Sequence, residues 1–303
     1  MMAGRRYVIL DVFAGRALEG NPLAVVLDAE GLDTARMQAI TREFNLSETV
    51  FVLPPESPRH TARIRIFAPE YEMPFAGHPT VGTAVALAAE HGMGDGELLV
   101  LEENIGPVRC IVRKGEGADF AEFDVPQIAA PLDAMLDPAA VAEALGLETS
   151  EIGFPGHTIG AWSAGVPYVT IPVSALEAIG RIRFDPYRWQ QVAPDRPGAQ
   201  KASAYVYCRE TQLPGSRFHM RMFVGAVPSY EDPATGSAAA AFVGAFAANE
   251  HPADGLHEVW IEQGVEMGRP SRIRLEVDVS GGKAATARIG GDAVIVARGE
   301  IYV

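Results

Sequence analysis

Apolar and polar residues alternate along much of the chain, which is the period of a half-buried β-strand. In the first quarter of the chain this pattern predicts four strands, near residues 7–12, 23–26, 48–53 and 62–67. Between the second and the third, apolar residues recur at helical spacing over 34–44, and Asp33 stands where an N-cap accepts the first N–H groups of a helix. This region therefore combines strands with one amphipathic helix.

Strand-like runs continue through the rest of the chain. Three of them, at 97–102, 107–113 and 120–125, are joined by links of only a few residues, which cannot carry a parallel crossover. We therefore expect these three strands to be antiparallel. The second half repeats the pattern, with strands predicted near 167–173, 202–208, 218–224, 258–262, 271–279 and 285–303.

Two alanine-rich segments, 79–90 and 233–248, are apolar on every side at helical spacing. A helix that is apolar all round is buried all round. Their side chains are mostly small, so neighbouring backbones can approach closely. Because the available strands are mostly antiparallel, the simplest arrangement is a sheet curled around one central helix, once in each half of the chain.

The length and one break in the pattern predict two domains. A chain of 303 residues is longer than one hydrophobic core usually organises. Turn-forming residues gather over 126–137, and Asp137 followed by Pro138 is typical of a helix start. We place the boundary at this break, which gives domains 1–128 and 129–303. The pattern leaves open which domain the last strand packs on.

The two alanine-rich segments open on a shared pattern. Residues 78–84 and 232–238 align without gaps as His or Asp, Pro, two variable residues, Gly, Thr or Ser, and Ala. If both helices begin at these steps, His78 and Asp232 are N-caps. A helix N-terminus favours an anion through its N–H groups and partial positive charge. Two such ends facing each other across a domain cleft would bind a small carboxylate.

Charge and hydropathy exclude several classes of partner. Lys and Arg number 25 against 39 Asp and Glu, a net charge of −14, which repels the phosphates of nucleic acids and anionic lipids. The longest apolar run, 238–248, is well short of the ~20 residues that a membrane helix needs. Asp11 interrupts the apolar stretch near the N-terminus, so no signal peptide is predicted. We expect a cytoplasmic protein that binds neither nucleic acid nor membrane.

Other catalytic motifs are incomplete. Residues 161–165 resemble a nucleophile elbow, but Ala161 stands in place of the first glycine. His251 and His257 lack a third metal ligand at a set spacing. The chain contains neither a complete phosphate-binding loop nor a dinucleotide fingerprint. We therefore expect no metal and no cofactor.

Four motifs, in order along the chain, resemble the phenazine-biosynthesis PhzF-like isomerase family. They are GNPLAVV (20–26), NLSETVFV (45–52), EMPFAGHPTVGTA (72–84) and YEDPATGSAAAA (230–241). The resemblance implies an α+β fold like that of diaminopimelate epimerase. Such a fold has two pseudo-symmetric domains, each a mostly antiparallel, barrel-like sheet wrapped around a central helix, with the site in the cleft between them. It also implies a homodimer.

The resemblance further implies which residues carry the chemistry. In the family, a glutamate in the Asn-Leu-Ser-Glu step transfers a proton. The implied catalytic residues of this chain are Glu48, His78, Asp232 and Ser237. To these we add the helix N-termini at Gly77 and Gly236, together with Asn21, as candidates for binding the substrate carboxylate.

The residues themselves support the role of Glu48. It opens a strand whose same-face neighbours are Val50 and Val52, so its carboxylate enters an apolar face. Poor hydration favours a carboxyl group that both takes and gives a proton near neutral pH. Without the family resemblance, a solvated glutamate at a strand edge is the alternative interpretation.

We therefore predict a cofactor-independent isomerase that moves a proton on a small carboxylate-bearing metabolite. The alternative is a metabolite-binding or scaffolding protein that retains the cleft without turnover. A racemase mechanism with two thiols is disfavoured, because Ala76 precedes Gly77 and neither Cys110 nor Cys208 lies in a helix-opening motif.

Overall fold

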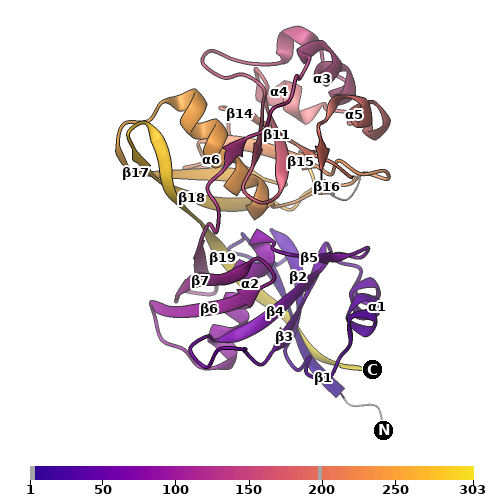
Figure 1. Cartoon of the computed structure of the whole chain (residues 1–303), viewed down its shortest axis with the longest axis vertical. Coiled ribbons are helices and arrows are strands. Elements are labelled where there is room, and N and C mark those ends of the chain that lie inside the picture. The colour runs from indigo at the N-terminus through magenta and orange to yellow at the C-terminus, as the bar shows by residue number, and fades with distance from the viewer. Residues whose placement is uncertain (1–3, 197–199) are drawn as a thin grey trace. The chain divides into compact units, whose positions relative to one another are not determined.

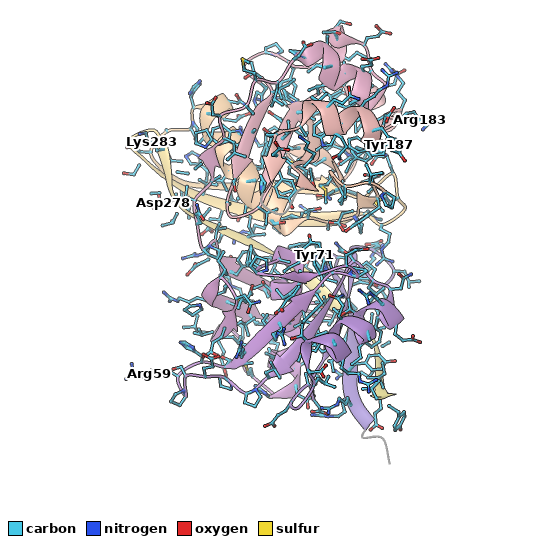
Figure 2. All side chains as sticks on the ribbon, turned by 45° about the vertical axis from the view of Figure 1, so that its right-hand side comes forward. Arg59, Tyr71, Arg183, Tyr187, Asp278 and Lys283 are labelled. Carbon is cyan, nitrogen blue, oxygen red and sulfur yellow. The ribbon has the colours of Figure 1, made fainter. Side chains whose placement is uncertain are left out.

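The computed structural model describes residues 4–196 and 200–303. It divides into two compact units. Unit 1 comprises Met1–Pro126 and Ile289–Val303, and unit 2 comprises Gln127–Arg288. The last strand, β19 (Lys283–Tyr302), therefore begins in unit 2 and ends in unit 1. Figure 2 shows Lys283 at the outer tip of the turn that leads into β19.

Unit 1 is built around a barrel. Its elements are β1 (Gly4–Val12), β2 (Asn21–Val26), α1 (Thr34–Phe44), β3 (Glu48–Leu53), β4 (Ala62–Phe67), β5 (Glu72–Met73), α2 (Gly77–Glu90), β6 (Glu97–Glu103), β7 (Gly106–Arg113) and β8 (Asp119–Asp124). The strands pair in the order β1, β2, β3, β4, β6, β7, β8 and β19, and β19 pairs with β1 to close the barrel.

Strand directions in unit 1 follow from the lengths of the connections. The neighbours β2–β3 and β4–β6 are parallel, and a helix, α1 or α2, lies in each connection. The hairpins β6–β7 and β7–β8 are antiparallel, which confirms the expectation for these short links. Asp33 accepts a hydrogen bond from the Arg36 N–H at 2.7 Å, so the predicted cap of α1 is also confirmed.

Helix α2 lies inside this barrel (Figure 1), and all of its residues from Gly77 to Ala88 are buried. Close packing against the sheet requires glycine at one point. A Cβ at Gly82 would lie 2.6 Å from Leu23 Cδ2 and 2.7 Å from Val12 Cγ2, closer than real Cβ contacts come. The prediction of a helix buried on every side is confirmed for this segment.

Unit 2 contains a second sheet with its own central helix. Its main elements are β9 (Ala130–Pro131), α3 (Pro138–Leu145), β10 (Gly160–Ser163), β11 (Pro167–Pro172), α4 (Leu176–Gly180), α5 (Pro186–Val192), β14 (Ser203–Cys208), β15 (Phe218–Phe223), β16 (Glu231–Asp232), α6 (Gly236–Glu250), β17 (Gly255–Gln263) and β18 (Ser271–Ser280). A 3-10 turn (Thr149–Glu151) and a short hairpin of β12 (Asp195–Arg196) and β13 (Gln200–Lys201) complete it. Every residue of α6 from Gly236 to Phe246 is buried, which confirms the second predicted core helix.

The pairing scheme of unit 2 repeats that of unit 1. Strands β10–β11, β14–β15 and β17–β18 are antiparallel, whereas β11–β14 and β15–β17 are parallel. This is the sequence of directions found from β1 to β7, with α6 in the place of α2. The fold is therefore α+β with two pseudo-symmetric units, each a mostly antiparallel sheet around a central helix, as predicted.

The repeat extends to individual side chains. Arg65 on β4 pairs with Glu72 on β5 at 2.6 Å, and Arg221 on β15 pairs with Glu231 on β16 at 2.7 Å. Each guanidinium also lies over the phenylalanine ring two positions later, at 5.1 Å and 4.8 Å from the ring centroid. The same ion pair thus fastens the short strand before each central helix.

Unit 2 carries extra helices that unit 1 lacks among its described residues. Helices α3, α4 and α5 gather together in Figure 1, and their apolar residues join one core cluster. Within α5, Trp189 is fully buried, whereas Tyr187 is 69% exposed and points outward in Figure 2. Asp137 caps α3 by accepting from the Ala139 N–H at 3.1 Å, with Pro138 as the first helical residue, as the sequence predicted.

The predicted starts of the two central helices are wrong. The N-caps are Ala76 for α2 and Thr235 for α6, not His78 and Asp232. His78 is the second residue of α2, and Asp232 is the last residue of β16, before a non-helical turn. The proline at position 79 did not mark the helix start, because a proline needs no N–H acceptor anywhere in the first turn.

Strand pairing explains the error. Glu72 on β5 pairs with Phe67, and Glu231 on β16 pairs with Phe223, so the two short strands occupy equivalent places. The structural counterpart of 72–78 is therefore 231–237. In this register His78 corresponds to Ser237, and both follow the glycine that opens a central helix.

Candidate functional site

Three elements of unit 1 bring Asn21, Glu48 and His78 together. Asn21 opens β2, Glu48 opens β3, and His78 is the second residue of α2. Strands β2 and β3 are parallel, with Leu23 opposite Glu48, so both strands begin at the same end of the barrel. The N-terminus of α2 lies at that end.

His78 bridges the other two side chains. Its Nδ1 lies 3.3 Å from Asn21 Nδ2, and its Nε2 lies 3.3 Å from Glu48 Oε2. Because the Asn21 amide N–H donates to Nδ1, the single ring proton belongs on Nε2, the nitrogen on the side of the glutamate. Asn21 therefore fixes the tautomer of an imidazole whose Nε2 lies close to the Glu48 carboxylate without a hydrogen bond of good geometry between them.

Burial decides the charge of the histidine. His78 is 4% exposed, and desolvation lowers its pKa to about 3, so the imidazole is neutral at physiological pH. The Glu48 side chain is 13% exposed and therefore keeps limited access to the outside. A neutral imidazole orients this carboxylate without taking its proton.

Gly20 positions Asn21 at the start of β2. Its φ is +67°, in the left-handed region, and a Cβ there would lie 2.3 Å from the Val12 carbonyl oxygen. Only glycine fits both conditions. The Gly-Asn step of the sequence motif therefore has a structural reason, which is to aim Asn21 at the histidine.

In unit 2 the corresponding end of α6 is held by a network around Asp232. The Thr235 hydroxyl donates to Asp232 Oδ2 at 2.5 Å, and Gln263 Nε2 donates to the Asp232 carbonyl oxygen at 2.8 Å and to Thr235 Oγ1 at 3.0 Å. The Ser271 hydroxyl donates to the Pro233 carbonyl oxygen at 3.1 Å. The turn before α6 is therefore fixed from β17 and β18, and this is why the helix starts only at Gly236.

Ser237 has a partner that the sequence did not indicate. The hydroxyl of Tyr168, on β11, lies 2.7 Å from Ser237 Oγ, and both residues are buried. Tyr168 lies 69 positions earlier in the chain, and nothing in its local sequence indicates that its hydroxyl group contacts a candidate site residue. Thr235 and Gln263 were missed for the same reason, whereas the motif did name Ser237, the second residue of α6, and Asp232, which lies before the helix and is not its N-cap.

The two helix N-termini differ in what their backbones offer. The first residues of a helix have no acceptor for their N–H groups within the helix. In α2 these are Gly77 and His78, because Pro79 has no N–H, whereas α6 offers Gly236, Ser237 and Ala238. Within residues 4–196 and 200–303, no three His, Cys, Asp or Glu side chains gather as metal ligands, and no helix is long and apolar enough to cross a membrane.

Comparison with known proteins shows the family of the chain. Residues 10–299 match the family model described as phenazine biosynthesis-like protein. The chain is 61% identical over 302 residues to an uncharacterized isomerase of Mesorhizobium japonicum, covering 100% of both proteins. It is 36% identical over 298 residues to a trans-2,3-dihydro-3-hydroxyanthranilate isomerase of Pseudomonas aeruginosa, covering 98% of this chain and 99% of that protein.

A solved structure is similar over the whole chain. A phenazine biosynthesis protein of the PhzF family from Bacillus anthracis superposes with a TM-score of 0.89 at 29% identity, covering 100% of both chains. The fold is that of the diaminopimelate epimerase-like proteins, as the motifs implied. The sequence match, the structural match and the four ordered motifs agree, and the chain belongs to the phenazine biosynthesis-like (PhzF) family of isomerases.

Proposed function

We propose that this protein is a cofactor-independent isomerase that moves a proton on a small carboxylate-bearing metabolite, with Glu48 as acid and base. The observation that carries the proposal is the buried contact between Glu48 and a neutral His78 that Asn21 orients. General acid–base catalysis needs a carboxyl group that is held in place and poorly hydrated. Glu48, whose side chain is 13% exposed and lies beside His78, fulfils both conditions.

The proposed reaction conserves mass. Glu48 removes a proton from a substrate carbon, and the electron pair of the broken C–H bond forms a new double bond while the π pair of an existing double bond moves onto another atom of the substrate. The protonated Glu48 then gives a proton to that atom, a carbon or heteroatom of the same molecule, and its carboxylate is restored. His78 Nε2 lies 3.3 Å from Glu48 Oε2, and we propose that the imidazole keeps the carboxyl group oriented between the two steps.

Unit 2 supplies the other proposed groups. Ser237 and the N–H groups at Gly236 bind the substrate carboxylate, as do Gly77 and Asn21 in unit 1. Asp232, whose Oδ2 accepts the Thr235 proton, stays an acceptor and suits an N–H or O–H group of the substrate. The Pseudomonas aeruginosa relative is named for a dihydro-hydroxyanthranilate, which carries a carboxylate, an amine and a hydroxyl group. We propose a metabolite of this class.

The experiment is a conversion assay with trans-2,3-dihydro-3-hydroxyanthranilate, followed by chromatography that separates isomers of equal mass. We expect a mass-neutral product with the native protein and none with Glu48→Gln, which keeps the shape of the side chain but cannot accept the proton. The matched control is Glu56→Gln, which changes an exposed glutamate paired with Arg63 and leaves turnover unchanged.

The outcomes also decide between the two function classes. Binding of this compound and of related carboxylates, detected by thermal shift without any isomeric product, would favour a metabolite-binding protein. Full turnover by Glu48→Gln would reject the assigned acid and base while keeping the isomerase. Both variants are checked by their melting temperatures, so that loss of folding is not mistaken for loss of chemistry.

A further inference from the structure

Glu103, the last residue of β6, is a buried carboxyl group that the proposed reaction does not use. The residue is 7% exposed, and its Oε1 lies 2.7 Å from the hydroxyl oxygen of Thr80 in the first turns of α2. The same hydroxyl oxygen lies 2.8 Å from the carbonyl oxygen of Ala76, the N-cap residue. Through one hydroxyl group, Glu103 is therefore connected to the turn that carries Gly77 and His78.

The protons available at Thr80 favour a neutral state of this carboxyl group. Thr80 has one hydroxyl proton and two neighbouring oxygens. A threonine within a helix commonly donates to the carbonyl oxygen four residues earlier, which here is that of Ala76, and we infer that the Thr80 proton serves this bond. The 2.7 Å contact between Thr80 and Glu103 is then made by a proton of the carboxyl group.

The second carboxyl oxygen of Glu103 also indicates a neutral acid. Glu103 Oε2 is buried and has no hydrogen-bond partner among the described residues. An ionised carboxylate would leave a charged oxygen in the interior without a donor, whereas a neutral acid leaves only a carbonyl oxygen, which costs much less free energy.

We propose that Glu103 is an uncharged carboxylic acid at neutral pH and that it positions the first turn of α2 by donating its proton to Thr80. It is a positioning residue, since it reaches Gly77 and His78 only through Thr80 and Ala76. The protonation state stands by itself, and only the consequence for turnover rests on the proposed function.

The surroundings keep the proton in place. Burial raises the pKa of Glu103 to about 8. The Cys110 thiol on β7 is also buried, and burial raises its pKa well above the usual value, as does the charge of Asp124, so the thiol adds no charge. The Thr80 hydroxyl group that contacts Glu103 is neutral too.

Ionisation would change the turn. A charged Glu103 would attract the Thr80 proton, and the Ala76 carbonyl would keep only the Thr80 backbone N–H, at 3.2 Å. The first turn of α2 would then be held by one bond in place of two.

Infrared difference spectroscopy tests the protonation state without any assay of activity. We expect the carbonyl stretch of a protonated carboxylic acid in the native protein at pD 7, its absence in Glu103→Gln, and its loss from the native protein as the pD rises through about 8. Glu97→Gln, an exposed position of the same strand, serves as the control and should keep the band. A native band that Glu103→Gln does not remove would overturn the proposal.

The positioning role is tested through the imidazole of His78. In the native protein its ¹⁵N resonances should shift as the pH rises through about 8, and in Glu103→Gln, whose amide donates at any pH, they should stay constant. Thr80→Val should keep the infrared band but lose the shift. The same native shift in Thr80→Val or Glu103→Gln would refute the role, and none of these results depends on whether Glu48 is catalytic.

Discussion

The N-termini of α2 and α6 occupy equivalent places in the two units, yet their polar groups are arranged differently. At α2, His78 makes two contacts of 3.3 Å, one with Asn21 and one with Glu48. At α6, Asp232, Thr235 and Ser237 make shorter hydrogen bonds, of 2.5 to 2.7 Å, through their side chains. The strand order and the central helix are repeated in the two units, but the polar side chains at the helix N-termini are not.

The difference separates two tasks. Long contacts to a neutral imidazole leave Glu48 able to change its proton content, and such contacts often tighten only when substrate is bound. Short contacts from fixed donors hold Asp232 and Ser237 in one orientation, which suits binding rather than proton movement. We therefore assign the moving proton to unit 1 and the orientation of the substrate mainly to unit 2.

The largest expected effect comes from the histidine of unit 1. His78→Leu removes both contacts and should lower kcat by about 10²- to 10⁴-fold, the usual contribution of a general acid–base system. Because the variant also removes the acceptor of a buried Asn21 N–H, it should lower the free energy of unfolding by about 1–3 kcal/mol, so activity is compared at a temperature where both variants are folded. His91→Leu, at the exposed C-cap of the same helix, is the control and should keep full activity. Equal activity of the two variants would remove the distinction between the units.

The second prediction compares the repeated ion pairs. Arg221 is 9% exposed and also donates to the Ile179 carbonyl oxygen at 2.8 Å, whereas the side chain of Arg65 is 16% exposed. Arg221→Met leaves a buried carboxylate and a buried carbonyl without donors, so it should lower the free energy of unfolding by about 3 kcal/mol. Arg65→Met should cost about 1–2 kcal/mol. Denaturant unfolding measures the free energy of unfolding of both variants, and an equal loss would show that the two ion pairs contribute equally to stability.

The third prediction concerns pH, since unit 2 contains a buried ionic cluster. Burial opposes a charge on His219, but its hydrogen bonds to Glu262 and Glu266, at 2.7 and 2.8 Å, outweigh burial and raise its pKa to about 9. Because the folded pKa lies above the unfolded value, this stabilisation is complete below about pH 6.5 and is lost as the pH rises through about 9. The loss should be roughly 3 kcal/mol.

His219→Gln is the matched variant for this effect, because it keeps a donor but cannot be charged. It should unfold at lower denaturant concentration than the native protein at pH 6 and at a similar concentration near pH 10. At acidic pH, the dependence of stability on pH has the opposite sign. The pKa values of Glu262 and Glu266 are lowered, since hydrogen bonds to His219 outweigh burial, so their contribution is lost as the pH falls below about 4.5. A pH profile of the variant identical to the native one would contradict this account.

The smallest effect is expected at the hydroxyl groups of unit 2. Ser237→Ala removes one proposed donor to the substrate carboxylate, and we expect it to raise KM by about 10-fold, with kcat changed less. Tyr168→Phe, which removes the partner of Ser237, should raise KM by a smaller factor. Steady-state kinetics separates the two parameters. A fall in kcat with an unchanged KM would place proton movement in unit 2 and reverse the comparison.

The sequence predicted the elements and the buried helices, because the spacing of apolar and polar residues depends directly on which faces of a strand or helix are buried. It also named Glu48 and His78, which lie within short motifs. It did not predict where α2 and α6 begin, because β5 and β16 set those points by pairing with β4 and β15. No local pattern of the chain records that pairing.

The sequence also did not predict contacts between residues that are far apart in the chain. Gln263 supports Asp232 from 31 positions away, and Thr80 meets Glu103 from 23 positions away. Single polar residues in β-strands look alike in sequence whether they are solvated or buried. The groups that support the site can be recognised only when the fold places them against the helix N-termini.

The central claim is that Glu48 carries the migrating proton, and the most direct measurement is turnover in heavy water followed by mass spectrometry and NMR of the product. We expect isomeric product with the native protein, carrying deuterium at the newly protonated carbon to the extent that the 13% exposed Glu48 exchanges its proton with solvent before returning it, and neither product nor exchange of carbon-bound hydrogen with Glu48→Gln. Native-like product that carries deuterium at the same carbon, formed by Glu48→Gln at the native rate, would contradict it.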